Sequence, residues 1–354
     1  MKIASVGFWH LHGKDYAAAA RANPQVDLVA VWDPDPARGR MAADDFGMEF
    51  VSELTEILAD DSIEGVIVCT ATVDHLDIVS RCLSAKKHVF VEKVLGTTLA
   101  DAQTLAALAH EQDVALVVSL WRSDRGYARQ IASLVSAGAI GEVTSARVRD
   151  GHPFALSTPE NPDGVLPETF YNVAEAAGGI LIDLCHPLYL VAQIVGYPSS
   201  VSGMFGAVSH HAVEDNAVVT FEYPSGALAI AETSSVTWIS PFSIEVHGTE
   251  GSILYSEPGI GALVAQRNGV PAFGPEPDDH ARLRIRSLTD STRSWVELAV
   301  EPDTPMAFDQ WVQHCQDGTR APENVELAVA LSGIVEAAYL SAAEHRVVPT
   351  RPLT

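Results

Sequence analysis

Five short apolar runs in the first third of the chain alternate with stretches of helical periodicity. The runs, which are rich in Val and Ile, are "KIASVG", "VDLVAVWD", "EGVIVCT", "KHVFVEK" and "VALVVS". The helical stretches between them cover residues 15–21, 36–45, 76–85 and 99–111. Continuous apolar strands that alternate with helices indicate a parallel sheet covered on both faces. The pattern therefore predicts a doubly wound α/β domain over residues 1–121.

Residues 122–354 show a different pattern, in which apolar and polar positions alternate along short segments. These segments include "SVSGMFGAV", "NAVVTFEY", "ALAIAETSSVTW", "FSIEVHGTEGSILYS" and "RSWVELAV". They predict an α+β domain with a large, mostly antiparallel open sheet, one face of which is covered partly by a helix at residues 180–195. The closing helices of this second domain can pack back on the first. An open apolar sheet face needs a partner, so we expect a homodimer or homotetramer.

Composition narrows the functional class. Of 354 residues, 47% are hydrophobic and 19% are charged, as is typical of a globular protein. The formal net charge of -24 argues against a nucleic-acid partner, because phosphate binding requires clustered Lys and Arg. The four cysteines are scattered, with neither metal-ligand nor redox spacing. We find no apolar run long enough to span a membrane and no secretion signal, and we therefore expect a cytoplasmic enzyme.

The residues that close the strands carry the candidate chemistry, because ligands of a doubly wound sheet bind beyond the carboxyl ends of its strands. Gly7 ends the first strand, at a turn into a helix whose free N–H groups can face a pyrophosphate. Trp9 stands where a second glycine is usual. We expect Trp9 and His10 to form the wall of an altered dinucleotide cradle.

Asp33 closes the second strand, 26 residues after Gly7. A carboxylate at this place can bind the ribose hydroxyls of a dinucleotide and repels a 2′-phosphate, which favours NAD over NADP. Asp35 and Pro36 already supply the cap and first turn of the next helix, so Asp33 is expected to be free for this ligand.

Several longer segments carry a resemblance that runs nearly end to end. They are "VIVCTATVDHLDIVSRCLSAKKHVFVEKVLGTTLADAQTLAALA", "IASLVSAGAIGEVTSARVR", "AAGGILIDLCHPLYL", "VHGTEGSILY" and "FDQWVQHCQDGTRAPENVELAVALSGIVEAAYLSA". In this order and spacing they resemble the Gfo/Idh/MocA oxidoreductases, the family of glucose–fructose oxidoreductase and inositol dehydrogenase. The resemblance implies an N-terminal Rossmann domain and an NAD-dependent dehydrogenase that acts on a secondary hydroxyl of a sugar, polyol or glycoside.

Three positions depart from the family pattern. The glycine fingerprint is reduced to Gly7, and Val94 stands where the Glu-Lys-Pro strand end would place proline. In "DLCHP" two residues rather than three separate Asp183 from His186. Helix positions i and i+3 share a face, so both side chains are still expected to point into one cleft.

The resemblance implies catalytic roles for Lys93, Asp183 and His186, and the chemistry of these groups agrees with it. Lys93 can bind the alcohol oxygen and stabilise developing negative charge. The unperturbed pKa of a histidine lies near neutrality, so His186 is expected to be the better proton acceptor, while Asp183 would orient the substrate or the imidazole. The candidate cofactor-binding residues are Gly7, Trp9, His10, Asp33, Thr70, Thr72, His75 and Glu92.

The candidate substrate contacts are Trp121, Arg149, His152 and Tyr171, for which linker or surface roles remain open. The segment "HPFALSTPENPDGVLPETFYNVAEAAGG" is rich in Pro and turn residues and predicts a loop over the cleft. No set of His, Cys and carboxylates has the sequence spacing of a zinc site, so no metal is expected.

Two other functions remain open. In one, the hydride transfer is transient: a sugar hydroxyl is oxidised, a substituent is eliminated from the neighbouring position, and the hydride returns, so that a glycoside is cleaved. In the other, the chain is a sensor that binds dinucleotide or sugar without turnover, since a fold can bind a ligand without catalysis.

Overall fold

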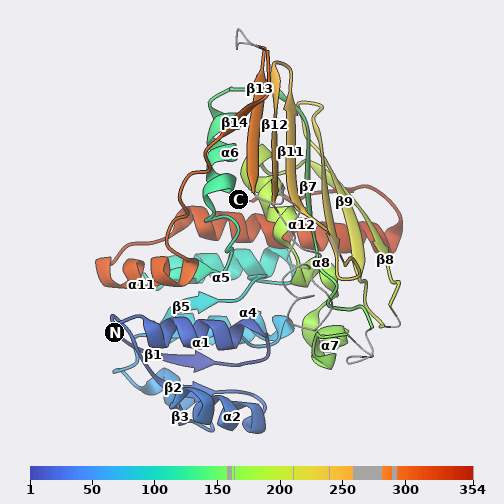
Figure 1. The fold of residues 1–354 in the computed structure, drawn as a ribbon. Helices are drawn as coiled ribbons and strands as arrows, with labels where there is room; N and C mark the ends of the chain where they lie inside the picture. The colour runs from blue at the N-terminus through green and yellow to red at the C-terminus, as the bar shows by residue number, and fades with distance from the viewer. Residues whose placement is uncertain are drawn as a thin grey trace.

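Two β-sheets organise the molecule, which is a computed structural model (Figure 1). The structure describes residues 1–157, 162, 164–209, 211–238, 240–257, 281–288 and 293–353. A parallel sheet with its helices forms the lower part of Figure 1, and a taller second sheet forms the upper part. The loop predicted over the cleft falls partly outside the described residues, at 158–161 and 163.

The first sheet has six parallel strands in the order β3-β2-β1-β4-β5-β6. Its strands are β1 (Lys2–Val6), β2 (Asp27–Trp32), β3 (Glu49–Phe50), β4 (Gly65–Val68), β5 (His88–Val91) and β6 (Leu116–Val118). All residues of β4 and β6 are buried, which explains why these runs are continuously apolar. The predicted doubly wound domain is confirmed, although the two-residue strand β3 was too short to be predicted.

Helices cover both faces of this sheet. They are α1 (His12–Ala22), α2 (Pro36–Phe46), α3 (Leu54–Ala59), α4 (His75–Ser84) and α5 (Leu99–Glu111), with a 3-10 turn η1 (Thr72–Asp74) before α4. The predicted cap of α2 is present, because an Asp35 carboxylate oxygen accepts the Ala37 N–H at 2.9 Å. Helix α5 begins where its pattern predicted it, at a capping box of Thr98 and Asp101.

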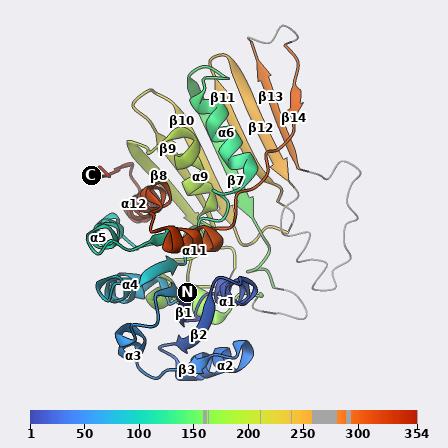
Figure 2. The same cartoon turned by 90° about the vertical axis from the view of Figure 1, so that its left-hand side faces the viewer.

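The second sheet has nine strands in the order β14-β13-β12-β11-β7-β10-β9-β8-β15, and every pair except β7–β10 is antiparallel. The strands are β7 (Val143–Gly151), β8 (Ser200–Gly206), β9 (Asn216–Glu222), β10 (Leu228–Ser234), β11 (Phe242–Gly248), β12 (Gly251–Glu257), β13 (Arg282–Ser287), β14 (Val296–Leu298) and β15 (Val348–Pro349). Figure 2 shows helices α6 (Gly126–Ser136) and α9 (His186–Val195) against one face. The mostly antiparallel open sheet is therefore confirmed.

The closing helices α11 (Ala307–Asp317) and α12 (Pro322–Glu344) pack back on the first domain. Phe308 and Trp311 of α11 share a buried cluster with Ile3 and Phe90. Contrary to our expectation that no run could span a membrane, α12 is long and apolar enough to do so. However, 61% of its apolar window is buried inside the protein, as in the core helix of a globular domain.

The predicted helix at residues 180–195 is broken in two. Helix α8 (Ile180–Asp183) follows a 3-10 turn η2 (Glu168–Tyr171) and helix α7 (Val173–Ala176), and the axis then bends by 52° before α9. Pro187 cannot donate to the carbonyl oxygen of Asp183 and its ring would crowd that oxygen. The expectation that Asp183 and His186 share one helical face is therefore wrong.

Candidate functional site

The end of β1 is a left-handed turn at Gly7, where φ is +88°. A Cβ at Gly7 would lie 2.7 Å from Thr70 Cγ2 and 2.9 Å from the backbone nitrogen of Thr70. Only glycine allows the ends of β1 and β4 to approach so closely in this conformation. The tight turn predicted from Gly7 is present without the other glycines of the usual pattern.

Trp9 packs beside this turn and ties it to the second domain. Its indole stacks on Phe170, with ring centroids 5.0 Å apart and planes 6° apart. Its Nε1–H donates to a carboxylate oxygen of Glu175 at 2.7 Å. Both partners lie between β7 and α8, so the loop after β1 is held by residues that are far away in the sequence.

Asp33 is not free, contrary to our expectation. Its carboxylate accepts the backbone N–H of Phe8 at 2.7 Å and that of Asp35 at 2.8 Å. Arg38 donates to both oxygens, from Nε at 2.9 Å and from a terminal nitrogen at 2.8 Å. The Arg38 guanidinium, in the first turn of α2, thus pairs with both oxygens of the Asp33 carboxylate. The argument from the Asp35 cap did not predict this pair.

Lys93 is the centre of the site, and it is 3% exposed at the end of β5. Its Nζ lies 3.1 Å from Asp183 Oδ1 and 3.6 Å from Glu92 Oε1, and it also donates to the backbone oxygen of Asp183. The structure therefore brings together Lys93 and Asp183, as predicted, across the boundary between the two domains.

These charges stabilise one another. Burial opposes the charge of Lys93, but the Asp183 and Glu92 carboxylates outweigh it and raise the pKa of the ammonium group. Burial likewise opposes ionisation of Asp183, but Lys93 and His10 hold its pKa well below the usual range. The pKa of Glu92 is lowered in the same way, against its burial, by His10, His12 and Lys93. Both carboxylates are therefore ionised at neutral pH.

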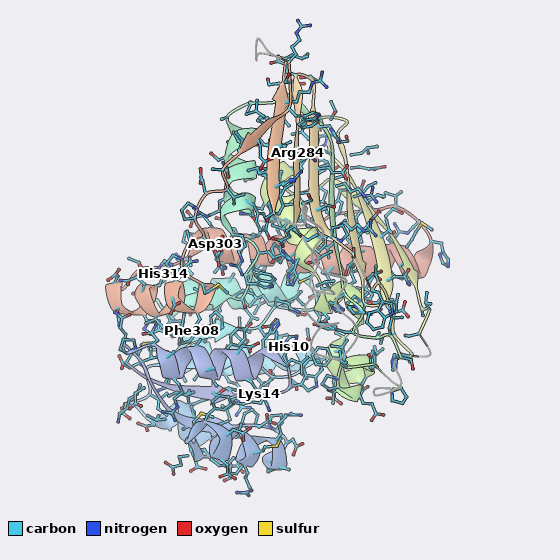
Figure 3. All side chains as sticks on the ribbon, viewed as in Figure 1. His10, Lys14, Arg284, Asp303, Phe308 and His314 are labelled. Carbon is cyan, nitrogen blue, oxygen red and sulfur yellow. The ribbon has the colours of Figure 1, made fainter. Side chains whose placement is uncertain are left out.

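His10 is the imidazole that faces this centre. Its Nε2 lies 3.2 Å from Asp183 Oδ1, while its Nδ1 accepts the backbone N–H of His12 at 3.2 Å. Burial lowers the pKa of His10, so the ring is neutral and carries its proton on Nε2. Figure 3 labels His10 at the edge of the first domain, below the second sheet.

His12 and Tyr16 form the outer side of the site, and neither was among the predicted site residues. His12 Nδ1 lies 3.2 Å from Glu92 Oε2, and the Tyr16 hydroxyl donates to the same oxygen. His12 and Tyr16 stand at positions i and i+4 of α1 and so lie on one face of the helix. That spacing, directly after a strand end, was a signal that could have identified them.

His186 lies in a separate network. Its Nε2 accepts the indole N–H of Trp121 at 3.1 Å, and its Nδ1 lies 3.1 Å from the Tyr189 hydroxyl. Burial lowers its pKa well below the usual range, so the ring is neutral. Both nitrogens of His186 are therefore occupied by protein partners, and Trp121 lies beside His186 rather than beside Lys93.

The remaining cofactor candidates lie at the end of β4. Thr72 is buried and lines a small cavity with Lys93. His75 Nδ1 lies 2.8 Å from the carbonyl oxygen of Val94, and burial lowers its pKa. Among the described residues, neither Thr70 Oγ1 nor His75 Nε2 has a hydrogen-bond partner, although both atoms are buried.

The substrate candidates are divided between the two faces of the second sheet. His152 is buried near Lys93 and Asp183; burial lowers its pKa to about 4. Tyr171 stacks on His211, with ring centroids 3.4 Å apart. Arg149 is not brought to the site. It pairs with Glu232 at 3.8 Å on the face of the sheet opposite the one that packs against α9.

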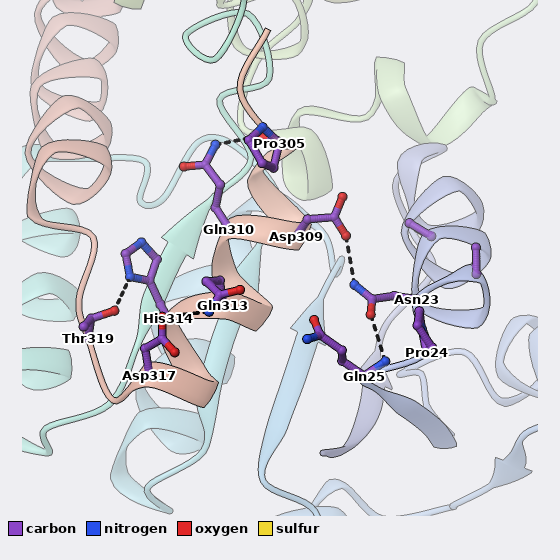
Figure 4. Close-up of a pocket in the computed structure, with 12 residues that line it drawn as sticks. Asn23, Pro24, Gln25, Pro305, Asp309, Gln310, Gln313, His314, Asp317 and Thr319 are labelled. Atoms are coloured by element: carbon purple, nitrogen blue, oxygen red, sulfur yellow. Dashed lines mark hydrogen bonds between the residues drawn. The ribbon is translucent and has the colours of Figure 1, made fainter.

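Cavity size alone does not locate the site. A cavity of about 860 Å³ lies between the end of α1 and α11 and is lined by surface residues such as Asn23 and Asp309 (Figure 4). The cavity beside Lys93 and Asp183 measures only about 20 Å³. A cavity needs roughly 10–15 Å³ of such space to hold one water, so this space, lined also by Trp9 and Phe170, admits a water but no sugar ring.

Comparison with known proteins agrees with this geometry. The oxidoreductase family with an NAD-binding Rossmann fold matches residues 1–120, and the Gfo/Idh/MocA C-terminal domain matches residues 128–254. The scyllo-inositol 2-dehydrogenase (NAD(+)) of Bacillus subtilis is 30% identical over 264 residues, which is 71% of either chain. The chain belongs to the Gfo/Idh/MocA oxidoreductases. The resemblance predicted from its motifs is confirmed.

Other Gfo/Idh/MocA proteins resemble the chain along most of its length. The myo-inositol 2-dehydrogenase of Thermotoga maritima is 28% identical over 72% of this chain and 74% of its own. The structure of GenD2 from gentamicin A biosynthesis, in complex with NAD, is 27% identical, with a TM-score of 0.76, and covers 99% of this chain and 97% of its own. The structure of a levoglucosan dehydrogenase in complex with NADH and L-sorbose has a TM-score of 0.78 and covers 100% of this chain and 99% of its own. At 18% identity, this similarity is one of fold.

The residues at the strand ends of this Gfo/Idh/MocA chain fit a nicotinamide dinucleotide in part. The close turn at Gly7 and the buried, unpartnered Thr70 Oγ1 and His75 Nε2 can receive a polar ligand at the ends of β1 and β4. At the end of β2, ribose hydroxyls have to share Asp33 with Arg38. NAD, when bound, accepts or returns the hydride.

Proposed function

We propose that this protein is a cytoplasmic NAD-dependent dehydrogenase that acts on a secondary hydroxyl of a sugar, polyol or glycoside. The observation that carries the proposal is the ion pair between Lys93 and Asp183, 3.1 Å apart and buried where the two domains meet. A buried ammonium at this place can donate to the oxygen of an alcohol or ketone and stabilise the negative charge that develops there.

The proposed roles follow from the protonation states. Lys93 is an ammonium, so in the reducing direction it supplies the proton that the ketone oxygen takes up. Asp183 fixes the Lys93 amine through two contacts and receives a hydrogen bond from His10. For His186, the occupied nitrogens support a positioning role, in which the ring holds Trp121 and Tyr189. His152 is the proposed substrate contact nearest to this centre.

A second copy of the chain is the proposed partner, as a homodimer or homotetramer. On the face of the second sheet opposite α9, the exposed side chains of Met204 on β8 and Val218 on β9 are direct register partners, and exposed Leu228 lies farther along, on β10 opposite Glu222. Apolar side chains that lie together on an open face indicate an interface. Sedimentation at micromolar concentration tests this, with Met204→Glu expected to shift the equilibrium toward monomer.

The function is tested with a panel of cyclitols, monosaccharides and glycosides, each incubated with NAD or NADP while the absorbance of the reduced nicotinamide is followed. A net rise that requires one class of polyol supports the proposal. Product without net reduction indicates transient oxidation and elimination, and binding without turnover indicates a sensor. In the same assay we expect His186→Asn to lower kcat less than Lys93→Ala does, because His186 faces Trp121.

A further inference from the structure

Three potential metal ligands converge beside the reaction centre, from two places 80 residues apart in the sequence. One ring nitrogen of His10, one of His12 and one carboxylate oxygen of Glu92 all lie within 4.8 Å of one another. We propose that these three side chains bind one first-row transition-metal dication. The role suggested for it below rests on the proposed function, but its binding does not.

The spacing of the ligand atoms fits a shared ion. Two ligands at 2.0–2.2 Å from a tetrahedral zinc ion lie about 3.4 Å from each other. His12 Nδ1 and Glu92 Oε2 are 3.2 Å apart, so this pair already has the required separation. The rings of His10 and His12 have centroids 4.4 Å apart.

Charge at the site also favours a cation. Glu92 is buried and Asp183 is partly buried, and among the described residues Lys93 is the ammonium in contact with both carboxylates. Together these three groups carry one net negative charge, which is costly at this depth. Without an ion, Glu92 raises the pKa of His12 against its burial, so a proton there can offset this charge, and a metal cation would replace that proton. With neutral imidazole ligands, a dication and one bound hydroxide or alkoxide would bring the total charge of Glu92, Asp183, Lys93 and the bound ions to zero. A bound ion would therefore hold an oxyanion beside Lys93.

Glu92 supplies a second, independent observation. Its side chain is only 2% exposed, yet Oε1 has no hydrogen-bond partner among the described residues and its nearest charged neighbour is Lys93 at 3.6 Å. The Tyr16 hydroxyl, which is also bonded to Ser119 Oγ at 2.7 Å, donates to Oε2 and orients the carboxylate. A carboxylate oriented from behind is typical of metal ligands.

The donor set selects the class of ion and His12 provides access. Two imidazoles and one carboxylate favour Zn²⁺, Co²⁺, Fe²⁺ or Mn²⁺ over Mg²⁺ or Ca²⁺, which prefer oxygen alone. His12 is 35% exposed while Glu92 and His10 are buried, so an ion can enter over His12. Once bound, it would polarise the substrate hydroxyl next to Lys93, releasing the hydroxyl proton to water.

The test is a titration of the untagged, full-length protein with CoCl2 after dialysis against a chelator. Visible absorption of Co²⁺ and calorimetry are followed for the wild type, His12→Asn, Glu92→Gln and a matched control, His110→Gln, which changes a histidine at the end of α5. We expect one Co²⁺ per chain in the wild type and the control, and at least about 100-fold weaker binding in the other two variants.

Folding is monitored independently through the melting temperature. Co²⁺ should raise the Tm of the wild type and of His110→Gln but not that of His12→Asn, because a ligand that binds only the folded state stabilises it. The inference is overturned if no saturable site is found, or if His12→Asn binds Co²⁺ as tightly as the wild type. Either result would mean that His12 and Glu92 hold a proton between them instead.

The two proposals can fail separately. The titration uses neither NAD nor a polyol. If the protein binds no Co²⁺ but reduces NAD in the presence of a sugar, the metal site is refuted and the dehydrogenase proposal stands. Conversely, one tightly bound Co²⁺ in a protein that turns over no member of the polyol panel, with or without metal, retains the site and removes the proposed function.

Discussion

Two ionic clusters, each around a buried cation, differ in what their charges do. In the first, Lys93 lies between Asp183 and Glu92, whose pKa values are lowered. In the second, Arg122 lies between Asp150, at 3.0 Å, and Glu257, at 2.8 Å. Each cluster has one cation and two carboxylates, but burial raises the pKa of Asp150.

The difference arises from the neighbours. Around Arg122 these are protein groups that complete its packing: the Tyr127 hydroxyl at 2.8 Å and the ring of Phe242, with the guanidinium 3.8 Å from its centroid. Around Lys93 they are the titratable rings of His10 and His12, next to Glu92 Oε1, which accepts no hydrogen bond within the described part of the chain. Asp150 Oδ2 accepts none there either, but it faces Arg122 Nε at 3.0 Å. We infer that the Arg122 cluster serves stability, whereas the Lys93 cluster keeps its charges available for a ligand.

The largest expected effect is on catalysis. Lys93→Ala should lower kcat by roughly 10²–10⁴-fold, because it removes the group that stabilises charge on the substrate oxygen. The measurement is turnover per folded molecule. Lys87→Met is the matched control: this buried lysine stands at the other end of β5 and donates to the backbone oxygens of Asp60 and Ile63. If both variants lost turnover equally, the loss in Lys93→Ala could not be assigned to a specific catalytic role of Lys93.

Arg122→Met should have its main effect on stability. It leaves Asp150 and Glu257 without their cation, which typically costs about 3–5 kcal/mol for a buried pair. The free energy of unfolding in urea should fall by this amount, with kcat per folded molecule within about threefold of the wild type. A large loss of kcat with unchanged stability would assign the Arg122 cluster to the active site.

Acid should weaken the fold through the buried histidines. Burial lowers the pKa of His152 from 6.5 to about 4. As the pH falls below 6.5, the unfolded chain binds a proton at this residue before the folded protein does. The stability that neutral His152 contributes to the fold is therefore present above pH 6.5 and is lost as the pH falls toward 4. The loss is on the order of 3 kcal/mol over this interval, at about 1.4 kcal/mol per pH unit. Urea denaturation at several pH values should show a shallower slope for His152→Gln; an identical slope would contradict the shift.

The smallest expected effect concerns the cofactor. Arg38→Met frees Asp33 from its bidentate partner, so the carboxylate can receive ribose hydroxyls and repel a 2′-phosphate. The ratio of kcat/KM for NAD to that for NADP should rise by about tenfold, near the worth of one charged hydrogen bond. The control is Arg40→Met, which removes another guanidinium of helix α2, one that lies over the ring of Phe50 in β3.

Much of the fold could be predicted because its signals are local. Alternating apolar runs and helical stretches predicted both sheets, and Asp35 marked the start of α2 at the observed residue. In the site, Lys93 and Asp183 were found from their motifs and do meet. The break between Asp183 and His186 was missed although Pro187 signalled it, because the helical pattern was extended across the proline.

The sequence alone determined the family, the two sheets and the charges at the strand ends, since periodicity and motif spacing depend on neighbouring residues. Only the tertiary structure decided which charge meets which. Arg38 forms an ion pair with Asp33, and Glu92 contacts His12. His10, rather than His186, faces Asp183. These contacts depend on how far one element slides and turns against another, and no pattern within a single element records that distance.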